Sequence, residues 1–175
     1  MSHFSTFIER NKTFADTDAR LAVPPIPFVP FQQTFVITCI DPRVEPAAIL
    51  GVGLGEAIVL RSVGGRVTPA VLQDVAWISH LHEAKTPDAD WFDLAVIHHT
   101  DCGSALYADD DLRHDFVTRG GYDDRTIAAL AVVEPAATVR EDVELLRAFT
   151  QLSSRVRVSG HTYDLRTGLL TTVLA

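Results

Sequence analysis

The sequence predicts an α/β fold: a mainly parallel central sheet with flanking helices and an antiparallel edge strand near the C-terminus. Three short runs are almost entirely apolar and rich in β-formers, which is typical of strands covered on both faces. These runs are Thr34–Ile40, Ala57–Val63 and Leu94–His98. Helix-like segments lie between and after them, and strands that alternate with helices favour a parallel sheet.

Two segments carry helix start signals. Thr68 and Pro69 fit an N-cap and the first helical position, and apolar residues recur at helical spacing after them. The run Thr138-Val-Arg-Glu141 has the pattern of a capping box and predicts a helix that opens there. Near the C-terminus, Arg155–Ser159 and Leu169–Val173 are expected to form a strand and its hairpin-like return.

The first part of the chain has a different character. Apolar residues at Phe4, Phe7, Ile8 and Phe14 predict a weakly amphipathic helix over residues 4–20. The stretch 24–30 holds four prolines, which suit an extended connector and exclude a helix. We therefore expect an N-terminal helical arm with its connector in residues 1–33 and one catalytic domain in residues 34–175.

Composition excludes several classes of protein. The net charge is -8, and no basic cluster is present that could neutralise a row of phosphates, so nucleic acid is not an expected partner. No apolar run approaches the ~20 residues needed to cross a bilayer, and the start lacks the features of a signal peptide. We expect a cytoplasmic protein without a membrane partner. In a reducing compartment, metal binding or catalysis is a better use of two cysteines than a disulfide.

Two motifs stand where predicted strands end. Cys39 is followed by Asp41 and Arg43, and His99 is followed by Cys102. In an open α/β sheet, ligands collect at the carboxyl ends of strands, so the two motifs could meet in one crevice. Together they offer two thiolates and one imidazole. Catalytic zinc characteristically takes three protein ligands and leaves the fourth position to water, so this set favours a catalytic Zn²⁺ site.

Each of these residues also has a simpler interpretation. Cys39 alone could be a small buried hydrophobe, and His99 alone could be a hydrogen-bonded structural histidine. Asp41 and Arg43 could form a surface ion pair. His82, together with His80 and Glu83, is expected to form a solvated rim of a helix.

The residues of these motifs resemble those of the β-class carbonic anhydrases, particularly the short bacterial and archaeal members. The resemblance runs from about Val36 to Gly103. Its carriers are Cys39-Ile-Asp-Pro-Arg43, Leu60-Arg-Ser-Val-Gly-Gly65 and Ile97-His-His-Thr-Asp-Cys-Gly103. It implies that Cys39, His99 and Cys102 are zinc ligands, that Asp41 and Arg43 form a dyad beside the metal, and that the chain forms a homodimer or homotetramer.

The implied reaction is the reversible hydration of carbon dioxide to bicarbonate by a zinc-bound hydroxide that the Asp41–Arg43 dyad orients. Arg43 would keep Asp41 ionised, and an ionised carboxylate can only accept a hydrogen bond, so the hydroxide proton would point at Asp41.

The sequence departs from the family pattern at Ser62 and Val63, where Asn and Ala are common. This departure keeps open a hydrolase of carbonyl sulfide or carbon disulfide on the same zinc site. An alternative of another class is a non-catalytic zinc or redox-responsive binding protein, in which Cys39 and Cys102 form a disulfide when the metal is absent.

Overall fold

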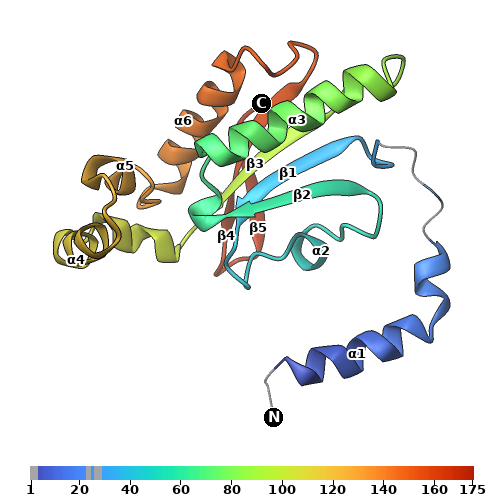
Figure 1. The fold of residues 1–175 in the computed structure, drawn as a ribbon, viewed down its shortest axis with the longest axis horizontal. Helices are drawn as coiled ribbons and strands as arrows, with labels where there is room; N and C mark the ends of the chain where they lie inside the picture. Colours follow the sequence, from blue (N-terminus) through green and yellow to red (C-terminus); the bar gives the residue numbers. More distant parts are fainter. Residues whose placement is uncertain (1–3, 23–24, 26–28) are drawn as a thin grey trace.

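Five strands form one sheet in the order β2-β1-β3-β4-β5 (Figure 1). They are β1 (Thr34–Cys39), β2 (Ala57–Ser62), β3 (Asp93–His99), β4 (Arg157–Asp164) and β5 (Leu169–Leu174). The computed structural model describes residues 4–22, 25 and 29–175. Strands β2, β1, β3 and β4 pair in parallel, and β5 returns antiparallel to β4. The predicted α/β fold with an antiparallel C-terminal edge strand is therefore confirmed.

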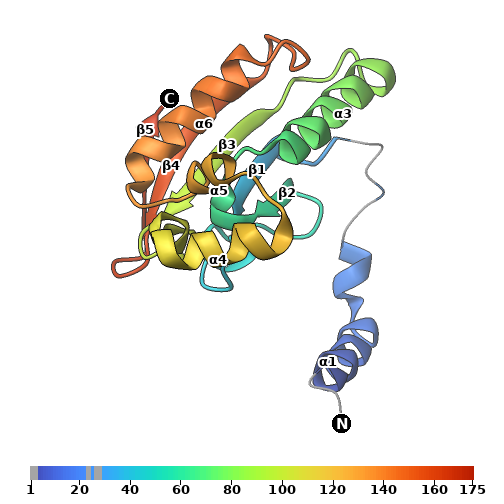
Figure 2. The same cartoon turned by 60° about the vertical axis from the view of Figure 1, so that its left-hand side comes forward.

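Helices flank the sheet and cover it mainly from one side in Figures 1 and 2. They are α1 (Ser5–Ala15), α2 (Pro46–Ile49), α3 (Pro69–Lys85), α4 (Asp110–Gly120), α5 (Asp124–Ala128) and α6 (Pro135–Ala148). Short 3-10 helices span Asp18–Ala22, Val63–Gly65 and Gly103–Ala108.

The main core lies between the sheet and the helices α3 and α6. Alternate residues of β1 and β3 pack against apolar residues of both helices, as expected when successive strand side chains point to opposite faces. The buried members are Phe35, Ile37, Val67, Val71, Val75, Leu94, Val96, Val139, Val143, Leu146 and Val158. This core fixes β1 and β3 side by side, so the residues at their carboxyl ends share one edge of the sheet.

One predicted helix start is confirmed and the other is wrong. Thr68 is the N-cap of α3, and its side chain accepts a hydrogen bond from the Val71 amide. Helix α6, in contrast, begins at Pro135 rather than at Thr138. Proline at the first helical position has a pre-set φ and needs no amide partner, which favours the earlier start. Thr138 consequently lies inside the helix and points toward the sheet, where its hydroxyl meets His98.

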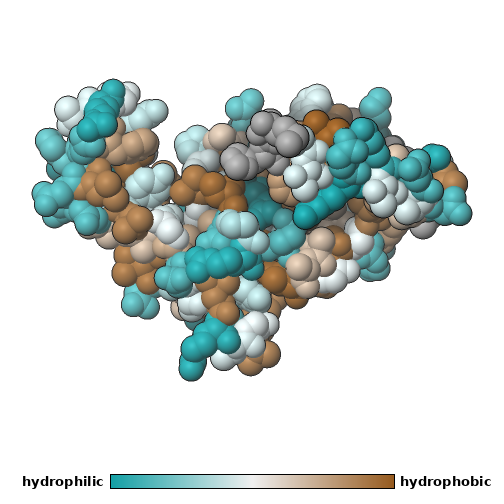
Figure 3. All heavy atoms as spheres, turned by 90° about the horizontal axis from the view of Figure 1, so that it is seen from below, coloured by the Kyte–Doolittle hydropathy of each residue, from teal (hydrophilic) through white to brown (hydrophobic). Residues whose placement is uncertain are grey.

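The N-terminal helix α1 stands apart from the sheet in both ribbon views (Figures 1 and 2). None of its residues is buried, and Phe4, Phe7, Ile8 and Phe14 are exposed. In the view from below, apolar side chains are interspersed with polar ones over much of the face on which α1 lies (Figure 3). The predicted proline connector falls largely on residues 23–28, most of which lie outside the described residues, and the domain boundary after residue 33 stays a prediction. Within the described part of the chain, no helix is long and apolar enough to cross a membrane.

Candidate metal centre

Parallel pairing brings the two sequence motifs to one edge of the sheet. Thr38 of β1 pairs with Ile97 of β3, so Cys39 and His99, which end these strands, come close together. Cys102 follows in the loop after β3. One ligand atom from each of Cys39, His99 and Cys102 lies within 4.8 Å of the others, and all three residues are buried. The structure therefore brings together the three residues that the sequence predicted as metal ligands.

His99 has a free nitrogen in this cluster. Its Nδ1 lies 2.9 Å from the main-chain carbonyl of Thr100, an acceptor, so Nδ1 carries the proton in the neutral ring. Its Nε2 is buried and has no hydrogen-bond partner among the residues that the structure describes. Buried polar atoms normally have partners, and a metal-bound histidine typically donates its other N–H to a carbonyl or carboxylate. The orientation of His99 thus fits an imidazole that offers its lone pair to a metal.

The two cysteine sulfurs are 3.9 Å apart and are not bonded. The Asp41 amide donates to the sulfur of Cys39 at 3.4 Å, and Ser104 Oγ lies 3.1 Å from the sulfur of Cys102. The hydrogen bond between the two sulfurs, followed by contacts with His99 and Ser104, lowers the pKa of the Cys102 thiol. The same shared proton and burial raise the pKa of Cys39. Two such sulfurs and one imidazole nitrogen are the donor types that Zn²⁺ prefers, so the cluster fits zinc.

Asp41 and Arg43 form a two-pronged ion pair beside the cluster. Arg43 Nη2 donates to Oδ2 of Asp41 at 2.7 Å, and Nε donates to Oδ1 at 3.0 Å. The Arg43 amide adds a hydrogen bond to Oδ1 at 2.8 Å. The side chain of Asp41 is only 12% exposed, whereas that of Arg43 is 50% exposed. The hydrogen bonds from Arg43 lower the pKa of Asp41 to about 2, so this carboxylate is ionised at neutral pH and acts only as an acceptor.

Arg61 stabilises the turn that carries Asp41 and Arg43. Its Nε donates to the carbonyl of Cys39 at 2.9 Å, its Nη2 donates to the carbonyl of Asp41 at 2.7 Å, and its Nη1 pairs with Glu45. These contacts fix the backbone between a candidate ligand and the dyad. Glu45 was missed in the sequence, since a single acidic residue after a turn carries no signal of its own.

Two glycines let the β2 end approach the site closely. Gly64 and Gly65 both have a φ of 71°, a left-handed conformation that glycine adopts without steric cost. A Cβ on Gly65 would lie 3.0 Å from the carbonyl of Ile97 and 3.1 Å from the amide of Cys39. The turn therefore packs directly against the ends of both ligand-bearing strands.

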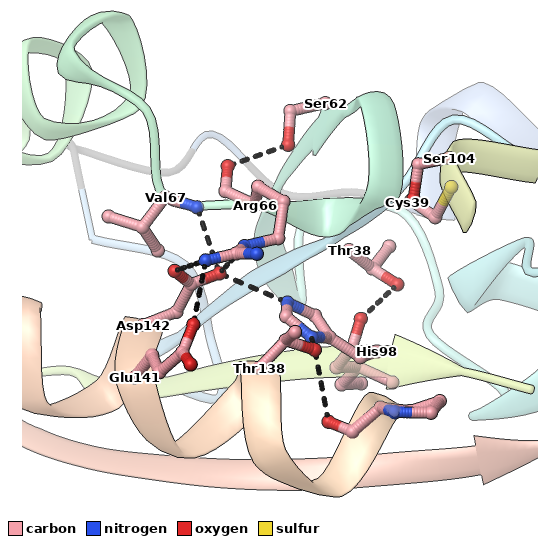
Figure 4. Close-up of polar contacts among 12 residues, drawn as sticks. Thr38, Cys39, Ser62, Arg66, Val67, His98, Ser104, Thr138, Glu141 and Asp142 are labelled. Carbon is pink, nitrogen blue, oxygen red and sulfur yellow. Dashed lines mark hydrogen bonds and ion pairs between the residues drawn. The ribbon is translucent and has the colours of Figure 1, made fainter. Parts of the chain in front are cut away.

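A buried polar network connects the carboxyl end of β3 to helix α6 (Figure 4). His98 Nδ1 lies 2.8 Å from the Thr138 hydroxyl, and His98 Nε2 lies 3.1 Å from Oδ2 of Asp142. Arg66 donates to the same carboxylate through Nε at 2.9 Å, and the Val67 amide donates at 3.1 Å. His98 is therefore a structural neighbour of the cluster that faces helix α6.

His82 is fully buried, which contradicts the solvated rim expected for it; His80 is exposed. Its ring lies edge-on to Trp91, with centroids 4.4 Å apart, and also contacts Phe92. The loop that leads into β3 folds back over the end of α3 and covers it. A sequence pattern within the helix could not reveal this contact.

Comparison with known proteins agrees with this geometry. A family model described as carbonic anhydrase matches residues 34–119, a range that holds Cys39, Asp41, Arg43, His99 and Cys102. A curated relative, beta-carbonic anhydrase 1 of Mycobacterium tuberculosis, is 26% identical over 149 residues that cover 85% of this chain and 86% of the relative. The chain is therefore similar to the β-carbonic anhydrases.

A solved structure extends the likeness to nearly the whole chain. The crystal structure of a carbonic anhydrase from Streptococcus mutans superposes with a TM-score of 0.79 and 29% sequence identity, and the match covers 99% of this chain and 98% of that one. A carbon disulfide hydrolase of an Acidianus species is 23% identical over 164 residues, covering 78% of this chain and 74% of that relative. Proteins with both of these names are therefore among the relatives of this chain.

Proposed function

We propose that this chain is a zinc-dependent carbonic anhydrase that catalyses the reversible hydration of carbon dioxide, CO₂ + H₂O giving HCO₃⁻ and H⁺. The family and its relatives support carbonic anhydrase activity. The observation that carries the finer proposal is the convergence of Cys39, His99 and Cys102, with the unpartnered Nε2 of His99, next to an ionised Asp41.

In this proposal Cys39, His99 and Cys102 hold the zinc ion. A zinc ion, when bound, supplies Lewis acidity that lowers the pKa of a water molecule and leaves one position open for it. Two thiolates cancel the charge of Zn²⁺, so the ion would lower the pKa of the water molecule less strongly. Neighbouring groups are then needed to prepare the nucleophile. The Asp41 amide donates to the buried sulfur of Cys39, and the Ser104 hydroxyl lies near enough to donate to a Cys102 thiolate, which suits sulfur ligands of this kind.

The chain's own residues orient the nucleophile. Asp41 would accept a hydrogen bond from the remaining O–H of the nucleophile, because its pKa is held at about 2 and it cannot donate at neutral pH. A lone pair of the water oxygen then faces the carbon of CO₂. Arg43 holds the carboxylate in place through both of its oxygens.

The test measures zinc content and carbon dioxide hydration on the same samples. Cys39→Ser and His99→Gln should lose stoichiometric zinc and should lose more activity than the roughly 10–100-fold typical of residues that only support ligands. His80→Gln is the matched control, because His80 is exposed and lies on α3 away from the cluster. Retained stoichiometric zinc in Cys39→Ser would remove Cys39 from the site.

Hydrolysis of carbonyl sulfide or carbon disulfide is the second candidate. Val63 lines a pocket of about 320 Å³ together with Gly103, Ser104 and Leu106, and the first two of these three follow Cys102 in the chain. The apolar side chains there suit a larger nonpolar substrate, and one relative is named a carbon disulfide hydrolase. Initial rates on carbon dioxide, carbonyl sulfide and carbon disulfide would separate the two: a faster rate on either sulfur compound would replace the first proposal.

A non-catalytic zinc or redox-responsive protein is the remaining alternative. The sulfurs of Cys39 and Cys102 are near enough that a modest movement could join them, since an S–S bond is about 2.0 Å long. Stopped-flow measurement of the zinc-loaded protein tests this alternative. Hydration no faster than the uncatalysed rate between neutral and alkaline pH would favour it over the enzyme.

We further propose that the chain is at least a homodimer in which α1 reaches a second copy, in an assembly that could extend to a homotetramer. The phenylalanines of α1, Phe7 and Phe14, are exposed and are not buried by any other described part of their own chain. An apolar helix face of this kind favours burial against another surface.

A further inference from the structure

Arg43 makes a second set of contacts that the dyad does not explain. Its Nη1 donates to Oδ2 of Asp101 at 2.8 Å, and its Nη2 donates to the main-chain carbonyl of Asp101 at 2.9 Å. An arginine has five N–H donors in a rigid fork. One edge of the fork faces Asp41 and the other faces Asp101, so the orientation of the guanidinium is set from both sides.

Asp101 lies in a special place in the chain. It stands between His99 and Cys102, in the loop that carries two of the three candidate ligands. Its φ is 52°, a left-handed backbone conformation that is uncommon for residues other than glycine and is most accessible to Asn and Asp. The loop therefore adopts this conformation at the one residue whose carbonyl and carboxylate both reach Arg43.

The two contacts join segments that are far apart in the sequence. Arg43 and Asp101 are separated by 58 positions, and Arg43 belongs to the turn after β1 whereas Asp101 belongs to the loop after β3. In the described part of the chain, Asp101 is the sole hydrogen-bond acceptor for Nη1 of Arg43. Without the Asp101 side chain, Nη1 of Arg43 would therefore have no hydrogen-bond acceptor among the described residues.

A simple surface ion pair is a weaker explanation. The side chain of Asp101 is 80% exposed, and exposed pairs typically contribute little to stability. A contact worth little to folding can still set the direction of a group that is already ordered, because an arginine held at both edges loses its freedom to rotate. The expected effect is consequently on catalysis rather than on folding.

We propose that Asp101 is a positioning residue that holds the guanidinium of Arg43 against Asp41 and so fixes the direction of the Asp41 carboxylate in the site. The proposal rests on the proposed function for its effect on rate, but the contact that it describes does not depend on which substrate is used. Asp101 acts through Arg43 and does not itself touch the reacting atoms.

Two substitutions test this role. Asp101→Asn keeps the shape of the side chain and the tolerance for a left-handed φ but removes the charge, and Asp101→Gly removes the side chain and keeps the backbone conformation accessible. We expect kcat for carbon dioxide hydration to fall roughly three- to tenfold in Asp101→Gly and less in Asp101→Asn, with KM little changed. Asp111→Asn, an exposed aspartate in the first turn of α4, should match the wild type.

A double-mutant cycle separates positioning from a general structural role. In an Arg43→Ala background, Asp101→Gly should cause no further loss, because the group that it holds is gone. Zinc content should remain stoichiometric in both Asp101 variants. An equal loss of activity with and without Arg43, or loss of zinc from Asp101→Asn, would overturn the proposal.

A readout that does not depend on activity completes the test. In isotope-labelled zinc-loaded protein, the Nε–H NMR signal of Arg43, assigned by its absence in Arg43→Lys, should shift and exchange faster with water in Asp101→Gly but not in Asp111→Asn. An unchanged signal would overturn the positioning role. If the wild type has no hydratase activity and the signal still responds to Asp101→Gly, the proposed function fails while the contact stands.

Discussion

His98 Nε2 lies 3.1 Å from Oδ2 of Asp142, and neither side chain is exposed to solvent by more than 2%. The pair links β3 to α6 directly beside the strand end that carries His99. Arg66 closes the network, because it donates to both oxygens of the same carboxylate and its own side chain is only 9% exposed. A charge buried in this way depends on its partners, since its desolvation is offset only by their hydrogen bonds.

We predict that Asp142→Asn destabilises the protein by about 3 kcal/mol, because it leaves the buried guanidinium of Arg66 with only the longer, exposed pair to Glu141 as a charged contact. Urea unfolding of the zinc-loaded protein measures this change. Asp115→Asn is the control, since Asp115 pairs with Arg119 on the exposed face of α4 and should cost less than about 1 kcal/mol. Equal losses in the two variants would contradict the role assigned to the buried network.

The same network predicts a pH dependence. Burial alone raises the pKa of Asp142, but hydrogen bonds from His98 and Arg66 outweigh it and hold the pKa below its ordinary value. A folded-state pKa below the unfolded value of about 3.9 gives stability that is present above that pH and is lost as the pH falls through the folded-state pKa. Unfolding free energies measured from neutral pH into acid should therefore converge for the wild type and Asp142→Asn. A difference that stays constant into acid would show that Asp142 does not titrate in this way.

Gly65→Ala should be more harmful than Gly121→Ala, although both glycines have a similar left-handed φ. The added Cβ would meet the backbone of Ile97 and Cys39 at 3.0–3.1 Å, and neither strand can move away without shifting a candidate ligand. We expect a loss of about 3 kcal/mol, from left-handed strain together with overpacking, and weaker zinc binding.

Gly121→Ala isolates the contribution of strain alone. Gly121 ends α4 with a φ of 67°, and a Cβ there would meet no atom within 4 Å. This variant should lose about 1 kcal/mol and keep its zinc. Chemical denaturation and metal analysis of both variants test the comparison, and similar losses in the two would rule out the close approach of Gly65 as the cause.

The strands could be predicted well from the sequence, because a short continuous run of apolar residues is enough to indicate a buried strand. The apolar runs of β1, β2 and β3 matched the observed strands to within one residue at each end. It also indicated which residues would meet at the sheet edge, because parallel strands place their carboxyl ends together. Cys39, His99 and Cys102 could be grouped in this way before any contact was known.

Other features depend on contacts between distant segments and had no local signal. Asp142 and Arg66 are 76 positions apart, and each alone resembles an ordinary surface charge. Thr138 looked like an N-cap because the capping pattern is local, whereas its position was decided by Pro135 and by the buried His98. Asp101 could not be paired with Arg43 from the sequence, since its left-handed φ and the direction of its carbonyl follow from the folded loop.

The proposed role of α1 predicts that its apolar face controls assembly. Phe7→Glu combined with Phe14→Glu places two charges on the same face, because the positions are two helical turns apart. The molar mass measured by light scattering after size-exclusion chromatography should fall toward that of one chain, whose mass is 19.2 kDa. Thr13→Glu, about 100° or more around the helix from both phenylalanines, should leave the mass unchanged. A double variant with the wild-type mass would remove α1 from the interface.

Removal of zinc should lower the thermal stability of the protein, because the three buried ligand groups face one another and gain from a cation between them. A ligand present at 1,000 times its Kd stabilises the folded state by about 4 kcal/mol. For a domain of this size, each 1 kcal/mol shifts Tm by about 2–4 °C, so a strong chelator should lower Tm by roughly 10 °C. Calorimetry with and without chelator measures the shift. His99→Gln supplies the comparison, because a variant that holds no zinc should show the same Tm in both conditions; a chelator effect as large in His99→Gln as in the wild type would mean that the metal binds elsewhere.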